Sequence, residues 1–291
     1  MCREEERPIC GSGNGRRGDR MKVYTEKDLE GFERDDLGWL ICPSGDYTQI
    51  KSFGERCSFG EVCNFGKECS FGEVCSFGDG CRFGDGCSFG RCCSFGECCS
   101  FGERCSFGEV CSFGERCSFG EVCNFGKECS FGERCSFGEV CSFGEWCRFG
   151  DGCRFGDGCS FGERCSFGEV CRFGEACSFG EACSFGEACS FGEVCSFGEA
   201  CRFGEVCSFE GGRVSGGRYM AVDRIGSEKR KTYFFADRDG NIFVRAGCWF
   251  SDLSAFKERV RDVHAGTRHE KEYLAACGLA ELMLMEEERC S

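Results

Sequence analysis

The stretch Cys57-Ser58-Phe59-Gly60-Glu61-Val62 is one unit of a hexapeptide repeat that fills residues 53–209. Phenylalanine recurs there at every sixth position without interruption, 27 times in all, and a cysteine accompanies it in register from Cys57 to Cys207. A strict short period over more than half of a chain is typical of a solenoid, in which stacked repeats bury one continuous core. The repeat therefore predicts the fold, whereas it indicates little about function.

Within one hexad, the alternation of a β-strand places Cys57 and Phe59 on one face and Ser58 on the other. Gly60 and the two residues after it are expected to form a corner, because glycine tolerates the backbone angles of a tight turn and leaves room beside a large ring. A strand and corner of six residues cannot bury its own phenylalanine. Successive coils must therefore stack and pair their backbones.

The order Phe59-Gly60-Glu61-Val62-Cys63-Asn64 resembles the motif of the hexapeptide-repeat family: a large aliphatic residue, glycine, two variable residues, a small residue and another variable one. The resemblance covers residues 53–209 and implies a left-handed triangular β-helix. The chain departs from the family by having Phe where the family has Leu, Ile or Val, and Cys where it has Ser, Thr, Ala or Val. This departure implies a wider or differently packed prism.

Three hexads per coil would give an all-β solenoid of about nine coils, about 43 Å long at roughly 4.8 Å per coil. Two hexads per coil, forming a flattened solenoid, is the alternative. The right-handed pentapeptide solenoid also buries Phe, but its period is five, and this chain has a period of six.

Changes in composition predict four regions. Residues 1–20 are charged and rich in glycine, and we expect them to be disordered. Residues 21–52 are expected to form an N-terminal cap, with two short strands around a turn within 38–50. Residues 53–212 are the β-helix, and residues 213–291 are expected to be a small α+β domain that caps it.

The C-terminal region carries recognisable local signals. Residues 231–235 and 242–246 predict a hairpin, and apolar residues at 253, 256, 260 and 263 predict a helix. Thr267 and Glu270 have the spacing of a capping box that opens a second helix. The run 239–250 resembles the tails of uncharacterised repeat proteins from gut bacteria and their phages, a resemblance that implies no established activity.

The start of the chain has no apolar segment of the signal-peptide kind, and no later stretch is long and apolar enough to span a bilayer. We therefore expect a cytoplasmic protein in a reducing compartment, without a membrane partner, although it has 34 cysteines.

The cysteine columns admit two interpretations. Cysteines of successive coils would lie close enough for disulfides, or for a metal ion held between thiolates. We favour small, buried, apolar side chains between the phenylalanine rings, because burial raises the pKa of a thiol and opposes thiolate formation. No metal or cofactor is expected. Cys92 and Cys98 occupy an outward corner position and are predicted to be the reactive thiols.

Acidic residues dominate the corners. The net charge is −14, and residues 53–209 carry 25 acidic and 13 basic side chains. An acidic residue follows glycine at 23 of the 26 Phe-Gly corners. The predicted binding residues on these acidic edges are Glu103, Glu109, Glu115, Glu121, Glu133, Glu139 and Glu145.

Solubility alone would account for these acidic edges. A second hypothesis is imitation of DNA, because 25 carboxylates over about 43 Å is about one per 1.7 Å, the charge density of B-DNA. The basic residues reduce that density by about half. Such a mimic would occupy a nucleic-acid-binding protein and would not itself bind nucleic acid.

Other sites receive weaker support from the sequence. The corner residues at 18-residue spacing, such as Arg56, Val74 and Cys92, are chemically mixed and do not predict a regular recognition face. The family resemblance implies an acyltransferase with a histidine base on a loop, but the repeat array contains neither histidine nor insertion.

Two further hypotheses concern the C-terminal region. Cys248 and His264 might pair as nucleophile and base, and Cys248, His264, His269 and Cys277 might bind zinc, but a Cys-x-x-Cys half-site is missing. We therefore expect a non-catalytic rigid scaffold that binds a protein partner. We also consider a homo-oligomer formed through the C-terminal domain.

Overall fold

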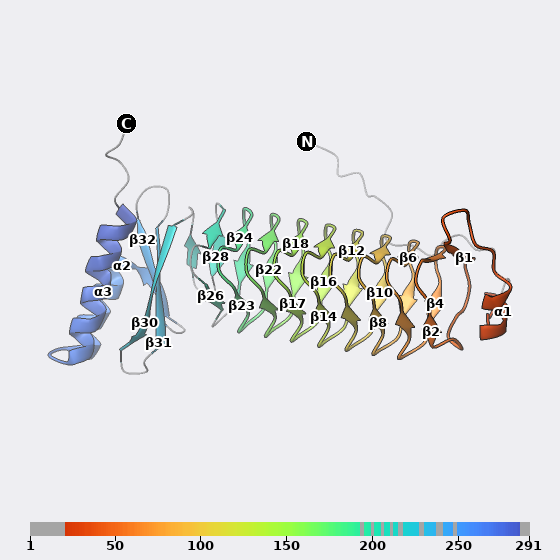
Figure 1. The fold of residues 1–291 in the computed structure, drawn as a ribbon. Coiled ribbons are helices and arrows are strands. Elements are labelled where there is room, and N and C mark those ends of the chain that lie inside the picture. The colour runs from red at the N-terminus through yellow and green to blue at the C-terminus, as the bar shows by residue number, and fades with distance from the viewer. Residues whose placement is uncertain are drawn as a thin grey trace, which may run out of the picture. The chain divides into compact units, whose positions relative to one another are not determined.

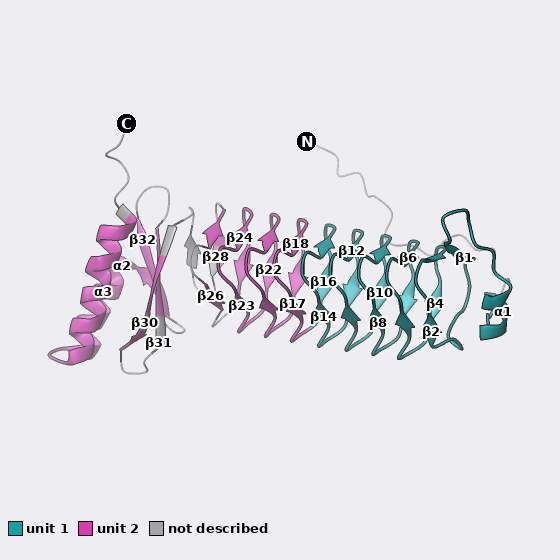
Figure 2. Cartoon of the chain, viewed as in Figure 1, with its two compact units in different colours: residues 1–138 teal, residues 139–291 magenta. Residues whose placement is uncertain are grey.

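In the computed structural model, the described residues are 21–192, 195–198, 201–204, 207–209, 212–214, 218–226, 230–236, 241–246 and 249–285. The repeats form a parallel β-solenoid of about nine coils with three stacked sheets, followed by a small antiparallel sheet and two helices (Figure 1). Residues 1–20, expected to be disordered, lie outside the described residues. The chain divides into two compact units, residues 1–138 and 139–291, which are described separately (Figure 2).

Unit 1 begins with one short helix and continues with strands of two or three residues that alternate among three sheets. Its elements are α1 (Glu26–Glu30), β1 (Leu40–Cys42), β2 (Ser52–Phe53), β3 (Cys57–Phe59), β4 (Asn64–Phe65), β5 (Ser70–Phe71), β6 (Ser76–Phe77), β7 (Arg82–Phe83), β8 (Ser88–Phe89), β9 (Ser94–Phe95), β10 (Ser100–Phe101), β11 (Ser106–Phe107), β12 (Ser112–Phe113), β13 (Ser118–Phe119), β14 (Asn124–Phe125), β15 (Ser130–Phe131) and β16 (Ser136–Phe137).

The register of the strands fixes three hexads per coil. Strand β10 pairs in parallel with β13, so that Phe101 lies beside Phe119, 18 residues further on. Backbone hydrogen bonds join the coils outside the strands as well: the Gly72 amide donates to the Phe53 carbonyl at 3.1 Å. The prediction of three hexads per coil is therefore confirmed, and the flattened solenoid with two is excluded.

Phenylalanine rings fill the centre of unit 1, as predicted. Rings of the same sheet stack almost parallel; Phe95 and Phe113, for example, have centroids 4.8 Å apart and planes inclined by 1°. Rings of neighbouring sheets meet edge to face, as Phe107 meets Phe101 at 5.0 Å. Both geometries are favourable for aromatic pairs. Each ring is thus buried between two rings of its own column and the edges of the other two columns.

The corner glycines serve a purpose other than the one expected from the sequence. The glycine after each phenylalanine does not adopt the left-handed conformation; the residue two positions later does, as in Val62 with φ 57° and Val110 with φ 60°. A Cβ on Gly108 would lie 2.7 Å from the Gly90 carbonyl carbon of the preceding coil. Glycine is therefore required by the close approach of two backbones rather than by its own angles.

The N-terminal cap extends the aromatic core. Strand β1 pairs with β3, as the sequence predicts, but residues 47–51 form no second strand. Tyr47, fully buried, stacks under Phe65 with centroids 5.4 Å apart, and Tyr24 stacks on Tyr47 at 4.9 Å. Tyr47 lies 18 residues before Phe65 and occupies the place of the missing phenylalanine, because its hydroxyl can donate to the Pro43 carbonyl.

The first part of unit 2 has the same coil structure. Its strands are β17 (Ser142–Phe143), β18 (Arg148–Phe149), β19 (Arg154–Phe155), β20 (Ser160–Phe161), β21 (Ser166–Phe167), β22 (Arg172–Phe173), β23 (Ser178–Phe179), β24 (Ser184–Phe185), β25 (Ser190–Phe191), β26 (Ser196–Phe197), β27 (Arg202–Phe203) and β28 (Cys207–Phe209). Strand β29 (Gly212–Val214) pairs with β28 in the antiparallel sense, which ends the parallel array.

Unit 2 ends in an antiparallel sheet of four strands covered by two helices. The strands are β30 (Arg218–Ile225), β31 (Arg230–Ala236), β32 (Ile242–Ala246) and β33 (Trp249–Asp252), and the helices are α2 (Leu253–His264) and α3 (Arg268–Met285). The predicted hairpin and both predicted helices are confirmed; β30 and β33 were not foreseen as partners of the hairpin. Within the described residues, no helix is both long and apolar enough to cross a membrane.

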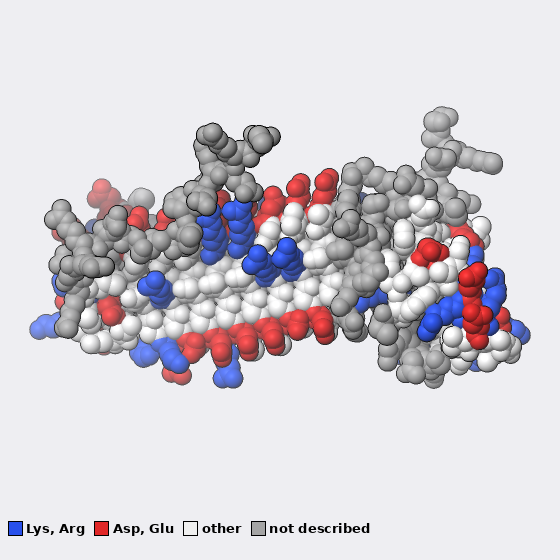
Figure 3. Space-filling model, turned by 180° about the vertical axis from the view of Figure 1, so that it is seen from behind, with Lys and Arg blue, Asp and Glu red and all other residues white. Residues whose placement is uncertain are grey.

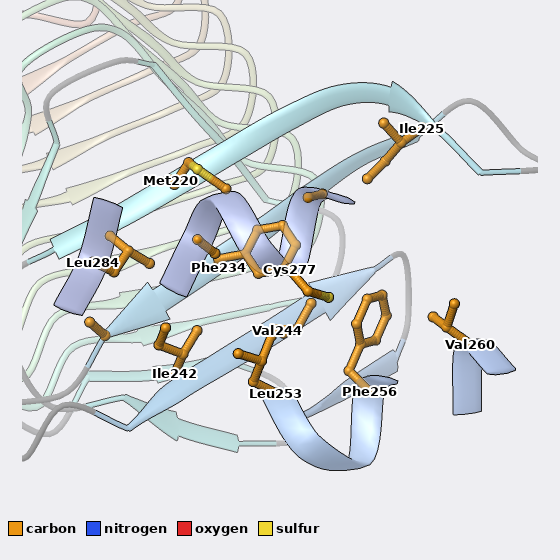
Figure 4. Packing of buried hydrophobic residues seen from close by; sticks show 13 residues of the cluster. Met220, Ile225, Phe234, Ile242, Val244, Leu253, Phe256, Val260, Cys277 and Leu284 are labelled. Carbon is orange, nitrogen blue, oxygen red and sulfur yellow. The ribbon is translucent and has the colours of Figure 1, made fainter. Parts of the chain in front are cut away.

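The helices cover one face of this sheet. Phe234 and Val244 project from β31 and β32 into a cluster with Leu253, Phe256 and Cys277 from the helices (Figure 4). The side chain of Asp252 accepts a hydrogen bond from the Ala255 amide at 2.8 Å and caps α2. Thr267 accepts from the Glu270 amide, whereas the Glu270 carboxylate bonds the Gly266 amide, so only half of the predicted capping box forms at Thr267.

The other face of the sheet contacts the last coils. The rings of Tyr233 and Phe235 lie 6.1 Å from those of Phe197 and Phe203, respectively. The buried Arg245 guanidinium donates to the Gly192 carbonyl at 3.4 Å. Strand β31 is therefore buried on both faces, by the helices on one side and by the end of the aromatic core on the other.

Candidate functional site

The most variable charged surface of the solenoid lies at its corners. In unit 1 the residues that follow each Phe-Gly pair form three rows, with successive members one coil apart. The first corner row is Glu55, Glu73, Arg91, Glu109 and Lys127; the second is Glu61, Asp79, Glu97, Glu115 and Glu133; the third is Lys67, Asp85, Glu103 and Glu121. Figure 3 shows acidic side chains following one another along one such row.

Backbone hydrogen bonds fix the spacing of these rows. In the second corner row, the Cys98 amide donates to the Glu115 carbonyl at 2.9 Å, and the Arg116 amide donates to the Glu133 carbonyl at 2.8 Å. Each acidic side chain therefore starts from a backbone that is tied to the next coil. The row is a rigid series of carboxylates at the coil spacing, rather than a set of mobile loop residues.

The predicted acidic residues separate among the rows. Glu103 and Glu121 share the third corner row, and Glu115 and Glu133 share the second. Glu109 lies in the first row and pairs with Arg91, with Nη2 and Oε2 3.1 Å apart.

The remaining two predicted acidic residues belong to unit 2, where every described residue in these positions is acidic. The three rows are Glu139, Asp157 and Glu175; Glu145, Glu163 and Glu181; and Asp151, Glu169 and Glu187. Glu139 and Glu145 therefore lie in different rows.

Aspartate at a corner has a structural role that glutamate lacks. The Asp79 carboxylate accepts a hydrogen bond from the Glu97 amide of the next coil at 2.8 Å, and Asp151 does the same for Glu169. Both aspartates precede a glycine in the left-handed conformation, Gly80 and Gly152. The Asp-Gly corners are thus partly explained by local geometry, whereas the Glu corners leave their carboxylates directed to solvent.

Cations interrupt two of the rows in unit 1. Lys67 Nζ lies 2.8 Å from the Asp85 carboxylate, and this ion pair lowers the pKa of Asp85 below its ordinary value. The Arg91–Glu109 pair acts similarly in the first corner row. The second corner row of unit 1 has no basic member, and it is the longest acidic series among the rows of that unit.

The strand faces carry a signal that the sequence reading missed. The outward residues on β2, β5, β8, β11 and β14 are serine or asparagine, and those on β3, β6, β9, β12 and β15 are all serine. The third sheet carries Arg82. Reading the residue between Cys and Phe at 18-residue spacing would have revealed these uncharged faces. The corner residues, on which the earlier reading depended, are mixed as expected.

The cysteine columns form weak hydrogen bonds between coils. The Cys111 thiol lies 3.5 Å from the Gly90 carbonyl oxygen, and Cys117 lies 3.4 Å from that of Gly96; in each pair the cysteine follows the glycine by 21 residues. A hydrogen bond with Cys129, together with burial, raises the pKa of the Cys111 thiol to about 12. Each column cysteine is thus a buried neutral thiol that covers a corner carbonyl, a role beyond filling space.

The two predicted reactive thiols differ in their surroundings. Cys92 is an exposed free thiol with φ 58°, whereas Cys98 is half-buried and already disulfide-bonded. Cys92 therefore remains the predicted reactive thiol of the two.

Replacing Cys92 with serine should remove one thiol from those that react within seconds with a chromogenic aromatic disulfide at neutral pH. The expected loss follows from the exposure of Cys92, because a reagent in water meets only accessible thiols. The matched variant Cys111→Ser should leave the fast phase unchanged, since Cys111 is buried. An unaltered fast phase in Cys92→Ser would contradict the assignment.

The other candidate site residues lie in the C-terminal domain. His264 and His269 have ring centroids 6.0 Å apart, and His269 Nδ1 lies 3.3 Å from the Glu272 carboxylate. Cys277 is fully buried in the core beneath the helices, where burial raises its pKa to about 11. Cys248 lies outside the described residues. In the described part of the chain, no three His, Cys, Asp or Glu side chains are grouped as metal ligands would be.

Comparison with known families gives one match. Segments of the repeat array match the model of an RNA-binding, Nab2-type zinc finger, at residues 63–78, 122–138, 146–168, 171–192, 182–198 and 188–209. These segments contain no histidine, and their described column cysteines point into the solenoid and are buried. A Cys₃His zinc site needs four converging ligands. The residues present do not fit such a site, and the match follows the recurring cysteines.

Neither a curated protein nor a solved structure matches the chain.

Proposed function

We propose that the protein is a non-catalytic rigid scaffold that presents rows of carboxylates to a basic protein partner. The observation that carries the proposal is the second corner row of unit 1, Glu61 to Glu133, whose members recur at every coil. Hydrogen bonds between coils hold the backbone of the row, so that binding would require little additional ordering of the backbone. The finer architecture proposed is the left-handed β-helix of the hexapeptide-repeat family, in a cytoplasmic protein.

A partner of opposite charge is favoured by the composition of this row. Its five carboxylates are joined by no basic member, and the coil spacing keeps them near 5 Å apart, as the stacked rings Phe59 and Phe77 are. At that distance the mutual repulsion in water is below roughly 1 kcal/mol per pair, and a cationic partner would relieve it. Charge complementarity of this kind accelerates association and depends strongly on salt.

The second candidate is the DNA mimic, and the geometry of the rows supports it. Three corner positions per coil at about 4.8 Å per coil give about one corner residue per 1.6 Å, near the 1.7 Å per charge of B-DNA. The partner would then be a protein that binds nucleic acid. Arg91 and Lys127 in the first row reduce the likeness.

The acyltransferase hypothesis has no such support. The resemblance implies a histidine base beside the prism, whereas His264 and His269 lie at the end of α2 and the start of α3.

Neutralising the second corner row tests the proposal. We expect the variant Glu97→Gln, Glu115→Gln and Glu133→Gln to lose at least tenfold in affinity for proteins that the full chain captures from host lysate, because three charge contacts disappear. The control variant Glu26→Gln, Glu30→Gln and Glu33→Gln removes the same charge from the N-terminal cap and should retain binding. Affinities are measured by interferometry at two salt concentrations, on partners identified by mass spectrometry.

Equal binding by both variants would overturn the proposal. Competition then separates the two candidates: duplex DNA added in excess should displace the partner of a DNA mimic, and should not affect a partner that binds only as part of a scaffold.

A further inference from the structure

Helix α3 has an apolar face that nothing in the described chain covers. Its inner side contributes Cys277 and Leu284 to the domain core (Figure 4). On its outer side, Leu279, Leu282 and Met283 are 46%, 62% and 58% exposed. Their spacing places them on one side of the helix together with the exposed Ala275. Monomeric proteins rarely expose such a contiguous apolar group, which is more typical of an interface.

The small and large residues of this face are separated along the helix. Ala275 and Gly278 form the half nearer its start, and Leu282 and Met283 form the half nearer its end. A Cβ on Gly278 would meet no atom within 4 Å, so the surface above it is open. Turned end for end, a second copy of the helix would place its large side chains over the small residues of the first.

The charges favour the same orientation. Arg268 and Lys271 lie at the start of α3, and Lys271 is exposed on the side of Ala275. A parallel pair would bring these cations against their own copies. An antiparallel pair separates them by most of the helix, which is about 27 Å long at 1.5 Å per residue. The sequence directly after Met285 is Glu286-Glu287-Glu288, which is opposite in charge to the start of the helix.

We propose that α3 pairs with α3 of a second copy of this chain, antiparallel and around a two-fold axis near Gly278. A patch that is complementary to itself under a half-turn forms a closed dimer, the commonest symmetric assembly. The interface is a single helix pair with leucine and methionine at its centre, so its dissociation constant falls in the micromolar range. The dimer would double the number of acidic rows available, and it does not depend on the proposed function of those rows.

Sedimentation of the full chain under reducing conditions tests the dimer. We expect a species of twice 32.2 kDa at tens of micromolar that dissociates on dilution. Leu282→Glu should weaken association at least tenfold, because it buries a charge at the centre of the pair. The matched change Leu37→Glu, at a leucine 74% exposed in unit 1, should leave the dimer intact.

A second variant separates dimerisation from folding. Gly278→Leu meets no neighbour in the single chain and replaces a poor helix former, so thermal stability should be unchanged or higher. It fills the hollow of the pair and should abolish the dimer. A monomeric wild type at all concentrations, or a dimer that persists in both Leu282→Glu and Gly278→Leu, would overturn the proposal.

Discussion

Replacing Gly108 with alanine should destabilise the solenoid by about 3 kcal/mol, in the upper part of the range for overpacked interiors. The added Cβ would lie 2.7 Å from the Gly90 carbonyl carbon and 2.8 Å from the Arg91 nitrogen. Both atoms belong to backbone that is hydrogen-bonded to the next coil, so neither can withdraw as a flexible side chain would. Equilibrium urea denaturation followed by circular dichroism would record the lower midpoint.

Gly54 provides the control for this prediction. It occupies the same position of the hexad, but a Cβ there would meet no atom within 4 Å, because no repeat coil precedes it. Gly54→Ala should therefore change the midpoint little. Equal losses of stability in the two variants would mean that the glycine is needed for its conformational freedom, as the sequence reading supposed, rather than for close packing of the coils.

The coil architecture was predictable because every hexad repeats the same local rule. Burial of Phe and Cys with outward Ser follows from alternation along a strand, and stacking follows from the inability of one hexad to bury a ring. The conformation of the corner was not predictable from local preference. Val62 and Val110 adopt the left-handed conformation, which β-branched residues avoid, and only the hydrogen bonds between coils account for it.

Contacts across coils needed the coil length before they could be inferred. The bond from a cysteine thiol to a glycine carbonyl joins residues 21 positions apart, which has no meaning until three hexads per coil is established. The same arithmetic reveals the caps. Tyr47 precedes Phe65 by one coil, and Arg245 donates to Gly192, whose thiol donor would be residue 213, an arginine.

The candidate site was predictable in composition but not in arrangement. The acidic residues at the corners were identified from the sequence, yet their division into rows, with Glu115 and Glu133 in an uninterrupted series and Glu109 paired to Arg91, required the register. The apolar outer face of α3 was hidden from the sequence. Its apolar residues surround the helix, and only the fold shows which of them face the core.

Replacing Phe107 with alanine should lower the free energy of unfolding by about 3–5 kcal/mol, the usual loss for a buried aromatic side chain. Phe107 stacks between Phe89 and Phe125 at 4.9 and 4.8 Å, and two other rings meet its edges. Rings on all sides are held by their own columns. They cannot collapse into the space, and the cavity therefore persists. Urea denaturation of the full chain measures the loss.

Phe107→Leu distinguishes the contribution of ring stacking from that of volume. Leucine occupies the corresponding position in the hexapeptide-repeat family, which the repeat resembles, so a coil of this kind can be built around it. If volume dominates, the variant should lose about 1.5 kcal/mol or less, as volume-conserving core changes do. A loss equal to that of Phe107→Ala would instead mean that each column depends on uninterrupted aromatic stacking. One aliphatic residue would then break the column, which would account for 27 phenylalanines in register without a single aliphatic substitute.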